Sequence, residues 1–295
     1  MSTGVLVMID RPALGQSGDG PAFRVAAADA PQLRVTNLGA TRGDGIFETA
    51  AIRDGHVQAS HEHLERFARS AAMLDLPAPD PDVYRAAVEL GVSLLPDASD
   101  ASVKYVLTRG DEHDAGSGPV GWAFLDVSED FSAARDEGVG IVLLSRGYPL
   151  DVAETSPWLL QGAKTLSYAV NKAALREAAR RGAEDVLFTT TDGYVLEGPT
   201  SSVVLRLGDE LVTTPPDTGV LPGTTQQGIF EYARSIGLTT EFRDIRVAEV
   251  GAADALWLTS SVRLAVAVRA VDGHERPADL ALTRQFNDYL ISRTD

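Results

Sequence analysis

The chain has three lysines among its 295 residues, Lys104, Lys164 and Lys172, so chemistry that needs a reactive amine has few candidates. Lys164 lies in the run Gly162-Ala-Lys-Thr-Leu-Ser-Tyr168, where an irregular segment leads into a helix predicted from about residue 166. The positive end of a helix dipole disfavours a cation and lowers the pKa of a nearby amine. Because a neutral amine is the form that attacks carbonyl groups, Lys164 is the candidate for Schiff-base chemistry. The alternative for an isolated lysine is a solvated residue at a helix start.

Glu197 is a second candidate because of its place at the end of a short predicted strand, just before Gly198 and Pro199. A carboxylate in such a position is most often a surface residue. If it faces the nitrogen of a pyridine ring, it keeps that nitrogen protonated and makes the ring an electron sink. This function requires a partner with a basic nitrogen.

The loop Leu221-Pro-Gly-Thr-Thr225 precedes a helix predicted over about 226–236. Backbone N–H groups and hydroxyls at a helix N-terminus bind phosphate, although an ordinary helix cap is about as common in such a loop. No lysine follows the glycine, so this is not a Walker A loop. The candidate phosphate ligands are Gly223, Thr224 and Thr225, with Ser260 and Ser261 at a strand end as further hydroxyl donors.

A phosphate site in a chain of net charge -16 needs a local cation. Arg66, in His63-Leu-Glu-Arg66 on a helix predicted over 61–74, supplies a guanidinium fork suited to phosphate. The nearby pair His61 and His63 does not predict a metal site, because alternate residues on a helix face different directions. We expect no bound metal. A Schiff-base lysine, a ring-facing carboxylate, a phosphate-binding helix start and a phosphate arginine together suggest pyridoxal 5'-phosphate.

Composition narrows the class of protein. The acidic balance, with a pI of about 4.7, argues against nucleic-acid binding and against an anionic membrane surface. The absence of cysteine from the sequence excludes disulfides, thiolate catalysis and iron–sulfur clusters. No apolar stretch approaches the roughly 18 residues of a membrane span, and no signal peptide is visible. We therefore expect a cytoplasmic protein.

The elements that must position these residues alternate between strands and helices in both halves of the chain. We predict a mixed α/β (α+β) fold with two domains. The N-terminal domain is expected over 1–146, a Pro-bearing interdomain linker over 147–158, and the C-terminal domain over 159–295. The main predicted helices cover residues 61–74, 82–95, 166–181, 226–236 and 278–293, and the main predicted strands cover 5–9, 46–53, 101–108, 120–127, 138–146, 185–190, 202–206, 240–247 and 255–259.

Five segments, in this order and at these separations, resemble the class IV aminotransferases, which include branched-chain and D-amino-acid transaminases and aminodeoxychorismate lyases. The resemblance runs from about residue 33 to residue 272. It implies pyridoxal-phosphate fold type IV, with a smaller N-terminal domain, a larger domain that carries the lysine, and a homodimer with the cofactor between the domains. The segments are Gly43-Asp-Gly-Ile-Phe-Glu-Thr49, His63-Leu-Glu-Arg66, Lys164-Thr-Leu-Ser-Tyr-Ala-Val-Asn171, Val195-Leu-Glu-Gly-Pro-Thr-Ser-Ser202 and Leu221-Pro-Gly-Thr-Thr225.

The resemblance also implies a role for each matching residue. Lys164 matches the Schiff-base lysine, Glu197 the residue that faces the pyridine nitrogen, and Arg66 the phosphate arginine. The remaining cofactor ligands are expected at Gly223, Thr224 and Thr225, with Ser260 and Ser261 near a second phosphate segment.

The resemblance implies an amino compound as the substrate. Fewer residues indicate which amino compound it is than indicate the cofactor. D-amino-acid transaminases carry an Arg-x-His trap for the substrate carboxylate, but here the strand end Thr108-Arg-Gly110 is followed by Asp-Glu-His-Asp, which lacks that arginine. Branched-chain enzymes usually have an aromatic residue where this chain has Arg42. The lysine and glutamate segments look most like 4-amino-4-deoxychorismate lyases. We expect that activity, with Arg42, Arg109 and Tyr168 as candidate substrate ligands. The alternatives are a D-amino-acid or branched-chain aminotransferase and, last, a catalytically silent cofactor-binding protein.

Overall fold

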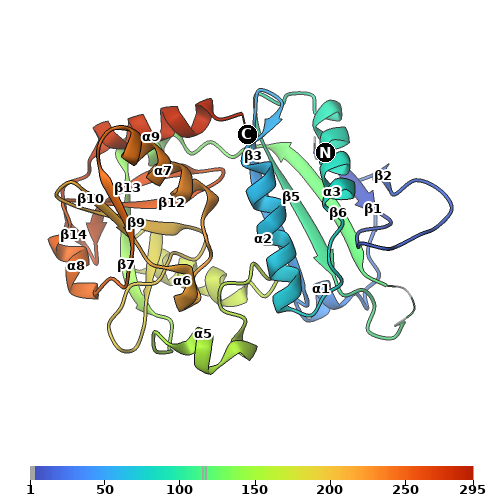
Figure 1. The fold of residues 1–295 in the computed structure, drawn as a ribbon, viewed down its shortest axis with the longest axis horizontal. Coiled ribbons are helices and arrows are strands. Elements are labelled where there is room, and N and C mark those ends of the chain that lie inside the picture. Colours follow the sequence, from blue (N-terminus) through green and yellow to red (C-terminus); the bar gives the residue numbers. More distant parts are fainter. Residues whose placement is uncertain (1–3, 115, 117, 295) are drawn as a thin grey trace. The chain divides into compact units, whose positions relative to one another are not determined.

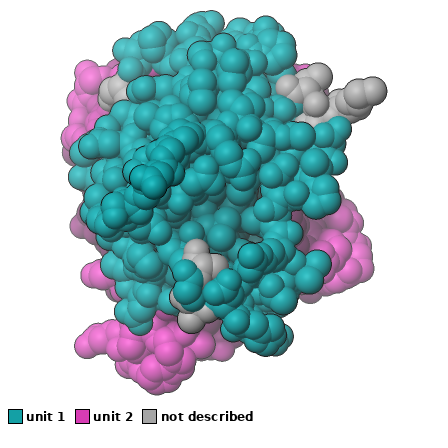
Figure 2. Space-filling model, turned by 90° about the vertical axis from the view of Figure 1, so that its right-hand side faces the viewer, with its two compact units in different colours: residues 1–129, 163–168, 294–295 teal, residues 130–162, 169–293 magenta. Residues whose placement is uncertain are grey.

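The structure is a computed structural model, and it describes residues 4–114, 116 and 118–294. The chain forms two compact units, which Figure 2 colours separately. The first unit holds the described residues up to Glu129, together with residues 163–168 and Thr294. The second holds residues 130–162 and 169–293.

In its described residues the first unit contains a six-stranded antiparallel sheet in the order β2-β1-β6-β5-β3-β4. Two amphipathic helices, α2 and α3, pack against the sheet, and Figure 1 shows α2 running along β3 and β5. The core between them contains Phe67, Tyr84 and Tyr105, whose rings meet at 4.9–5.7 Å between centroids. The elements are β1 (Val5–Ile9), β2 (Phe23–Ala26), α1 (Leu38–Thr41), β3 (Gly45–Arg53), β4 (His56–Val57), α2 (Ser60–Met73), α3 (Pro81–Leu94), β5 (Asp100–Thr108) and β6 (Val120–Val127).

A short segment from much later in the chain completes this unit. Lys164 accepts a hydrogen bond from the Phe47 N–H at 3.0 Å, and the Leu166 N–H donates to the Gly45 carbonyl at 2.8 Å. Ile46 and Thr165 form an isolated antiparallel bridge between these bonds. The segment therefore satisfies the backbone groups at the first residues of β3, on the edge that β5 does not use.

In its described residues the second unit contains an eight-stranded mixed sheet in the order β11-β10-β9-β12-β13-β7-β8, with β14 paired to β13. Neighbouring residues of each central strand pack on opposite faces, as the two-residue period of a strand requires. Leu256 and Leu258 belong to one buried cluster and Trp257 to another, which α7 and α9 cover. The strands are β7 (Val139–Ser145), β8 (Asp185–Thr189), β9 (Ser202–Leu207), β10 (Glu210–Thr213), β11 (Thr239–Phe242), β12 (Ala255–Ser260), β13 (Leu264–Val271) and β14 (His274–Glu275).

The helices of the second unit differ in length and in their place on the sheet. Figure 1 shows α7 and α9 over the same part of the sheet, where Phe286 of α9 packs on Trp257 at 5.3 Å between ring centroids. The helices are α4 (Ser132–Glu137), α5 (Val152–Thr155), η1 (Pro157–Leu159), α6 (Ala169–Arg180), η2 (Pro216–Thr218), α7 (Thr224–Ser235), α8 (Val247–Ala252) and α9 (Leu280–Ser292). None of the helices in the described residues combines the length and apolar character needed to cross a bilayer.

The division into units differs from the boundaries expected at 146 and 159. The chain passes from the first unit to the second at 129/130, so β7 belongs to the second unit. The expected linker over 147–158 lies inside that unit and carries α5 and part of η1. Residues 163–168 return to the first unit because the edge of β3 binds them. Composition alone gave no sign of this pairing.

Candidate active site

Lys164 has a fixed backbone and a side chain directed at an aromatic ring. Its Nζ lies 4.6 Å from the ring centre of Phe47, and the Tyr168 ring meets Phe47 edge-on at 5.5 Å between centroids. The Lys104 ammonium lies 5.8 Å from the same ring. The prediction that Lys164 lies at a helix start was wrong, because α6 begins only at Ala169. The helix-dipole argument therefore does not apply to its amine.

Arg66 belongs to a buried charged cluster in the first unit, with Glu48 on β3 and His63 on α2. The three residues are 4%, 0% and 1% exposed, respectively. Arg66 Nε and Nη2 donate to the two carboxylate oxygens of Glu48, each at 2.7 Å. His63 Nδ1 lies 2.7 Å from Glu48 Oε2. The bidentate ion pair fixes the plane of the guanidinium, as arginine–carboxylate forks do.

Burial and charge act in opposite directions on the ionisable groups of this cluster. Burial alone would raise the pKa of the Glu48 carboxyl, but Arg66, followed by His63, holds that pKa well below its usual range. Burial lowers the pKa of His63; Glu48 opposes this change, while the charges of Arg66 and Lys164 add to it. We therefore assign an ionised Glu48 and a neutral His63 at neutral pH.

In the second unit, Glu197 lies next to the loop that precedes α7. Its Oε2 accepts a hydrogen bond from the Leu221 N–H at 3.1 Å. The Glu197 backbone is also anchored, because its carbonyl accepts a bond from the Phe188 N–H at 2.9 Å. Glu197 is therefore tied to the strand β8 by its backbone and to the candidate phosphate loop by its side chain.

The first turn of α7 has the features of a phosphate site. The helix begins at Thr224, two positions earlier than predicted, so Thr224 and Thr225 are in its first turn. Gly223 is the N-cap and has no side chain to satisfy the N–H groups there. A Cβ at Gly223 would lie 2.3 Å from the Ser202 Oγ, so the chain approaches Ser202 too closely for any larger residue. A phosphate group supplies the acceptors that such a turn needs.

A second observation in the same turn supports a polar ligand. The Gln226 Nε2 is buried and has no hydrogen-bond partner among the described residues. Buried donors are normally satisfied, so an orphaned one needs an explanation such as a ligand or a water. The donors of this turn, together with a carboxylate at Glu197, fit the phosphate and the ring nitrogen of pyridoxal phosphate.

Ser260 is the last residue of β12, which pairs with the start of β9, and Ser261 follows it. Thr259 lies opposite Ser202 in this register, and Ser202 is the residue that underlies Gly223. The second unit thus brings the Ser260 region, Gly223 and the start of α7 into one neighbourhood.

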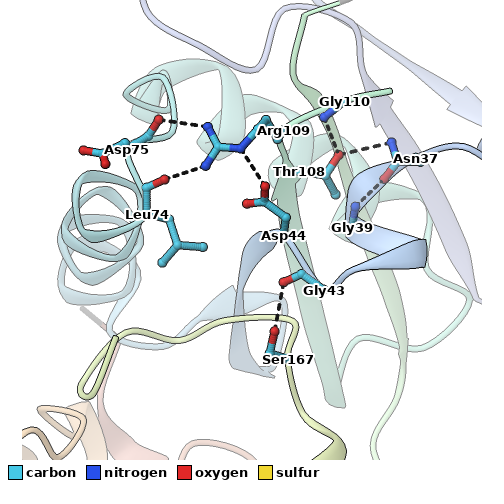
Figure 3. A network of polar contacts seen from close by, with 10 residues as sticks. All are labelled: Asn37, Gly39, Gly43, Asp44, Leu74, Asp75, Thr108, Arg109, Gly110 and Ser167. Carbon is cyan, nitrogen blue, oxygen red and sulfur yellow. Dashed lines mark hydrogen bonds and ion pairs between the residues drawn. The ribbon is translucent and has the colours of Figure 1, made fainter. Parts of the chain in front are cut away.

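The two candidate substrate arginines differ in their surroundings. Arg109 is engaged by three oxygens: its Nε donates to Asp44 at 2.6 Å, Nη1 to the Asp75 carbonyl at 3.1 Å and Nη2 to the Leu74 carbonyl at 2.6 Å (Figure 3). These contacts tie β5 to the end of α2. Arg42 is exposed and has a weak contact of 3.5 Å between its Nη2 and Glu112. Arg42 is therefore the arginine with donors to offer a substrate.

The acidic loop after β5 is partly neutralised. Arg34 Nη1 lies 3.2 Å from Asp111 and 3.3 Å from Asp114, and Asp111 also accepts a hydrogen bond from the Thr36 hydroxyl at 2.6 Å. The sequence suggested that these acids repel a carboxylate. Pairing with Arg34 and Arg42 weakens that repulsion.

Sequence reasoning missed Glu48, His63 and Ser70 as parts of the site. Ser70 accepts a hydrogen bond from the Lys164 N–H at 3.1 Å and is 1% exposed. One signal was present: Glu48 is a charged residue inside the apolar run of a strand, and such residues are rarely buried without a partner.

Comparisons with known proteins identify the family of this chain. A profile of the family described as amino-transferase class IV matches residues 45–271. The bifunctional aminodeoxychorismate lyase / D-amino acid transaminase of Mycobacterium tuberculosis is 43% identical over 84% of this chain and 88% of its own length.

Two sets of solved structures share the fold. A fold IV-transaminase from Curtobacterium pusillum has a TM-score of 0.96 and 49% identity, over 100% of this chain and 99% of its own. A hypothetical aminotransferase from Mycobacterium tuberculosis has a TM-score of 0.89 and 38% identity over 98% of this chain and 99% of its own. It was solved in a PLP-bound form and in a form with α-ketoglutarate and PMP. The predicted mixed fold of type IV is confirmed.

Proposed function

Because the chain belongs to the class IV aminotransferases, which are pyridoxal-phosphate enzymes, we propose that it converts 4-amino-4-deoxychorismate to 4-aminobenzoate and pyruvate. The observation that carries the catalytic assignment is Lys164: its backbone is bonded on both sides and its amine lies 4.6 Å from the Phe47 ring centre. The lyase activity in the name of the 43% identical relative supports this choice of substrate.

We assign the cofactor contacts residue by residue, as the family resemblance implies them. Lys164 would bind the cofactor covalently, and Glu197 would keep its ring nitrogen protonated. Arg66 would meet the phosphate, with Gly223, Thr224, Thr225, Ser260 and Ser261 as further ligands. The bound cofactor supplies an electron sink for the amine-bearing carbon of the substrate.

The reaction itself requires one base and a fixed substrate. Lys164 would accept the proton from the amine-bearing carbon. The C–O bond at the neighbouring carbon then breaks, and the departing enolpyruvyl group gains a proton to become pyruvate. Aromatisation of the ring drives the reaction, so the protein contributes mainly orientation and a proton acceptor. Arg42 is the candidate for a substrate carboxylate, and Tyr168 lines Phe47 beside the lysine.

Transamination of D-amino acids is the second candidate function. It is favoured by the bifunctional name of the same relative and by the PMP-bound form of the Mycobacterium tuberculosis structure. Lys164 would again accept the proton but would return it to the cofactor side. Transamination of branched-chain amino acids remains the alternative for the same residues. We further propose a homodimer, which the family resemblance implies, working in the cytoplasm.

Two assays on the purified enzyme distinguish these activities. Incubation with enzymatically made aminodeoxychorismate should release pyruvate and 4-aminobenzoate in equal amounts. Incubation with D-alanine or L-leucine, without a keto acid, should convert the cofactor to its amine form only if the enzyme is a transaminase. Rapid conversion without any lyase activity would reverse our order of the two functions.

The catalytic assignment is tested by locating the cofactor on the chain. Borohydride reduction followed by peptide mapping should find the pyridoxyl group on Lys164, and Lys164→Ala should abolish turnover by either route. Lys172→Ala is the matched control because Lys172 lies on the surface of α6. A reduced adduct on Lys104 or Lys172 would disprove the assignment.

A further inference from the structure

We propose that Ser70 is a positioning residue for the active-site lysine. Its hydroxyl oxygen holds the backbone of Lys164 in place and so fixes the position from which the lysine side chain extends. The inference rests on the proposed function of Lys164, since it assigns Ser70 a role only through that residue.

The contact is a buried backbone-to-side-chain hydrogen bond. The Lys164 N–H donates to the Ser70 Oγ at 3.1 Å, and Ser70 is 1% exposed. The Lys164 carbonyl accepts from the Phe47 N–H at 3.0 Å. Both backbone groups of the lysine are therefore held by the first unit, one by α2 and one by β3.

The position of Ser70 in its helix makes this bond unusual. A serine inside a helix usually bonds to a carbonyl one turn earlier or faces solvent. The Ser70 oxygen instead accepts from a residue 94 positions further along the chain. Replacing Ser70 by alanine would remove this acceptor from the Lys164 N–H, while the bond from the Phe47 N–H to the Lys164 carbonyl stays in place.

The same face of α2 carries the charged cluster. Residues at i, i+3 and i+7 lie above one another on a helix, so His63, Arg66 and Ser70 face the same way. The helix thus presents Arg66 to Glu48 and Ser70 to Lys164. The helix α2 therefore holds both the Arg66 guanidinium, which is proposed to bind the phosphate, and, through Ser70, the backbone of Lys164, the proposed base.

A lysine needs this support more than a shorter residue does. Its amine stands at the end of a flexible four-carbon stem, so a displaced backbone moves the reacting atom. Misplacement by about 1 Å costs on the order of 100-fold in rate. We therefore expect Ser70 to affect the chemical step rather than the binding of substrate.

The test is Ser70→Ala, with readouts in both the cofactor-free and the loaded protein. In cofactor-free protein, hydrogen–deuterium exchange at the Lys164 amide should accelerate about 10-fold or more, since a hydrogen bond to that N–H is lost. Exchange at the Phe47 amide should change less. In the loaded enzyme, kcat should fall roughly 10-fold to 100-fold while KM for the amino substrate stays unchanged. Ser70→Thr keeps the oxygen and should restore most of kcat.

Tyr84→Phe is the matched control, because Tyr84 also makes a buried side-chain hydrogen bond in the first unit, to the Val106 carbonyl at 2.9 Å. It should lower stability without changing exchange at Lys164. The proposal is overturned if the Lys164 amide exchanges rapidly in the unmodified protein, or if Ser70→Ala leaves both exchange and kcat unchanged. Borohydride mapping of the same samples separates the two ideas: an adduct on Lys164 with no effect of Ser70 refutes only this inference.

Discussion

Three neighbouring ionisable side chains are buried together in the first unit, where losing their water costs free energy. Glu48, His63 and Arg66 are almost completely buried, and the Arg66–Glu48 fork compensates for the loss of water around both charges. Breaking one partner of such a pair typically costs about 3–5 kcal/mol, because a buried charge is then left alone. The His63 imidazole is neutral in this cluster because burial lowers its pKa.

We predict that His63 makes the protein less stable in mild acid. Burial lowers the pKa of His63 below its ordinary 6.5, so below that pH the unfolded state binds a proton that the folded state does not. The stabilising contribution is complete above pH 6.5 and is lost as the pH falls, at about 1.4 kcal/mol per unit. Chemical denaturation of His63→Asn, which keeps a donor to Glu48, should show a shallower dependence between pH 7.5 and 5.5. Identical slopes would contradict the prediction.

Arg42 and Arg109 provide a second comparison at this scale. Arg109→Gln should lower stability by about 1–3 kcal/mol, because Asp44 and two carbonyls at the end of α2 lose charged donors. Arg42→Gln should leave stability unchanged and raise KM for a dicarboxylate substrate. Steady-state kinetics and denaturant unfolding of both variants measure the difference. A larger KM effect at Arg109 would mean that its network opens for the substrate.

The residues proposed to touch the cofactor stand in sequence motifs, whereas the residues proposed to support them do not. Lys164, Glu197 and Arg66 stand in recognisable runs, and these assignments remain predictions until the adduct is mapped. Ser70 and Glu48 act through residues far away in sequence, and no local pattern encodes a contact between α2 and residue 164. Supporting residues of this kind become visible only once the elements are placed in space.

At the scale of elements, the start of α7 offers a steric test. Gly223 has an ordinary φ of -78°, so alanine there is not strained by its backbone, but its Cβ would lie 2.3 Å from the Ser202 Oγ. Such overpacking typically costs about 1–3 kcal/mol. If this turn binds the phosphate, Gly223→Ala should weaken cofactor binding roughly 10-fold or more, as measured by absorbance titration.

The control removes the obstructing oxygen instead of the new methyl group. Ser202→Ala in the Gly223→Ala background should recover much of the affinity, although the Ser202 Cβ would still lie 3.2 Å from the new Cβ. Ser202→Ala alone should change affinity little. Equal affinities in all four proteins would show that this turn does not contribute to cofactor binding.

Elements with strong periodicity were predicted closely, and irregular ones were not. The helices expected over 61–74 and 82–95 are α2 and α3, displaced by one residue at each end. The helix expected from residue 166 starts at Ala169, because 164–166 pairs with β3 and cannot be helical at the same time. Strand β2 (Phe23–Ala26) was not predicted. In these cases the local structure depends on which strand a segment pairs with, and hydrophobic periodicity carries no information about pairing partners.

The whole molecule is organised as two units with separate cores. Phe67 and Tyr84 lie in the first, and Trp257 and Phe286 in the second, all four fully buried. A two-domain α/β fold was predictable from the alternation of strands and helices. The domain boundaries were not predictable from the sequence. Residues 163–168 join the first unit through backbone hydrogen bonds, and such bonds do not depend on which side chains the segment carries.

Net charge predicts how two such molecules would associate. Each copy carries a formal charge of -16, so two copies repel one another over a Debye length of about 30 Å at 0.01 M salt but only about 8 Å at 0.15 M. A homodimer should therefore have twice the 31.3 kDa mass of one chain at physiological salt and should dissociate more readily when salt is lowered. Analytical ultracentrifugation over a dilution series at both salt concentrations measures this. A single-chain mass under every condition would refute the dimer, and tighter association at low salt would indicate an interface of opposite charges.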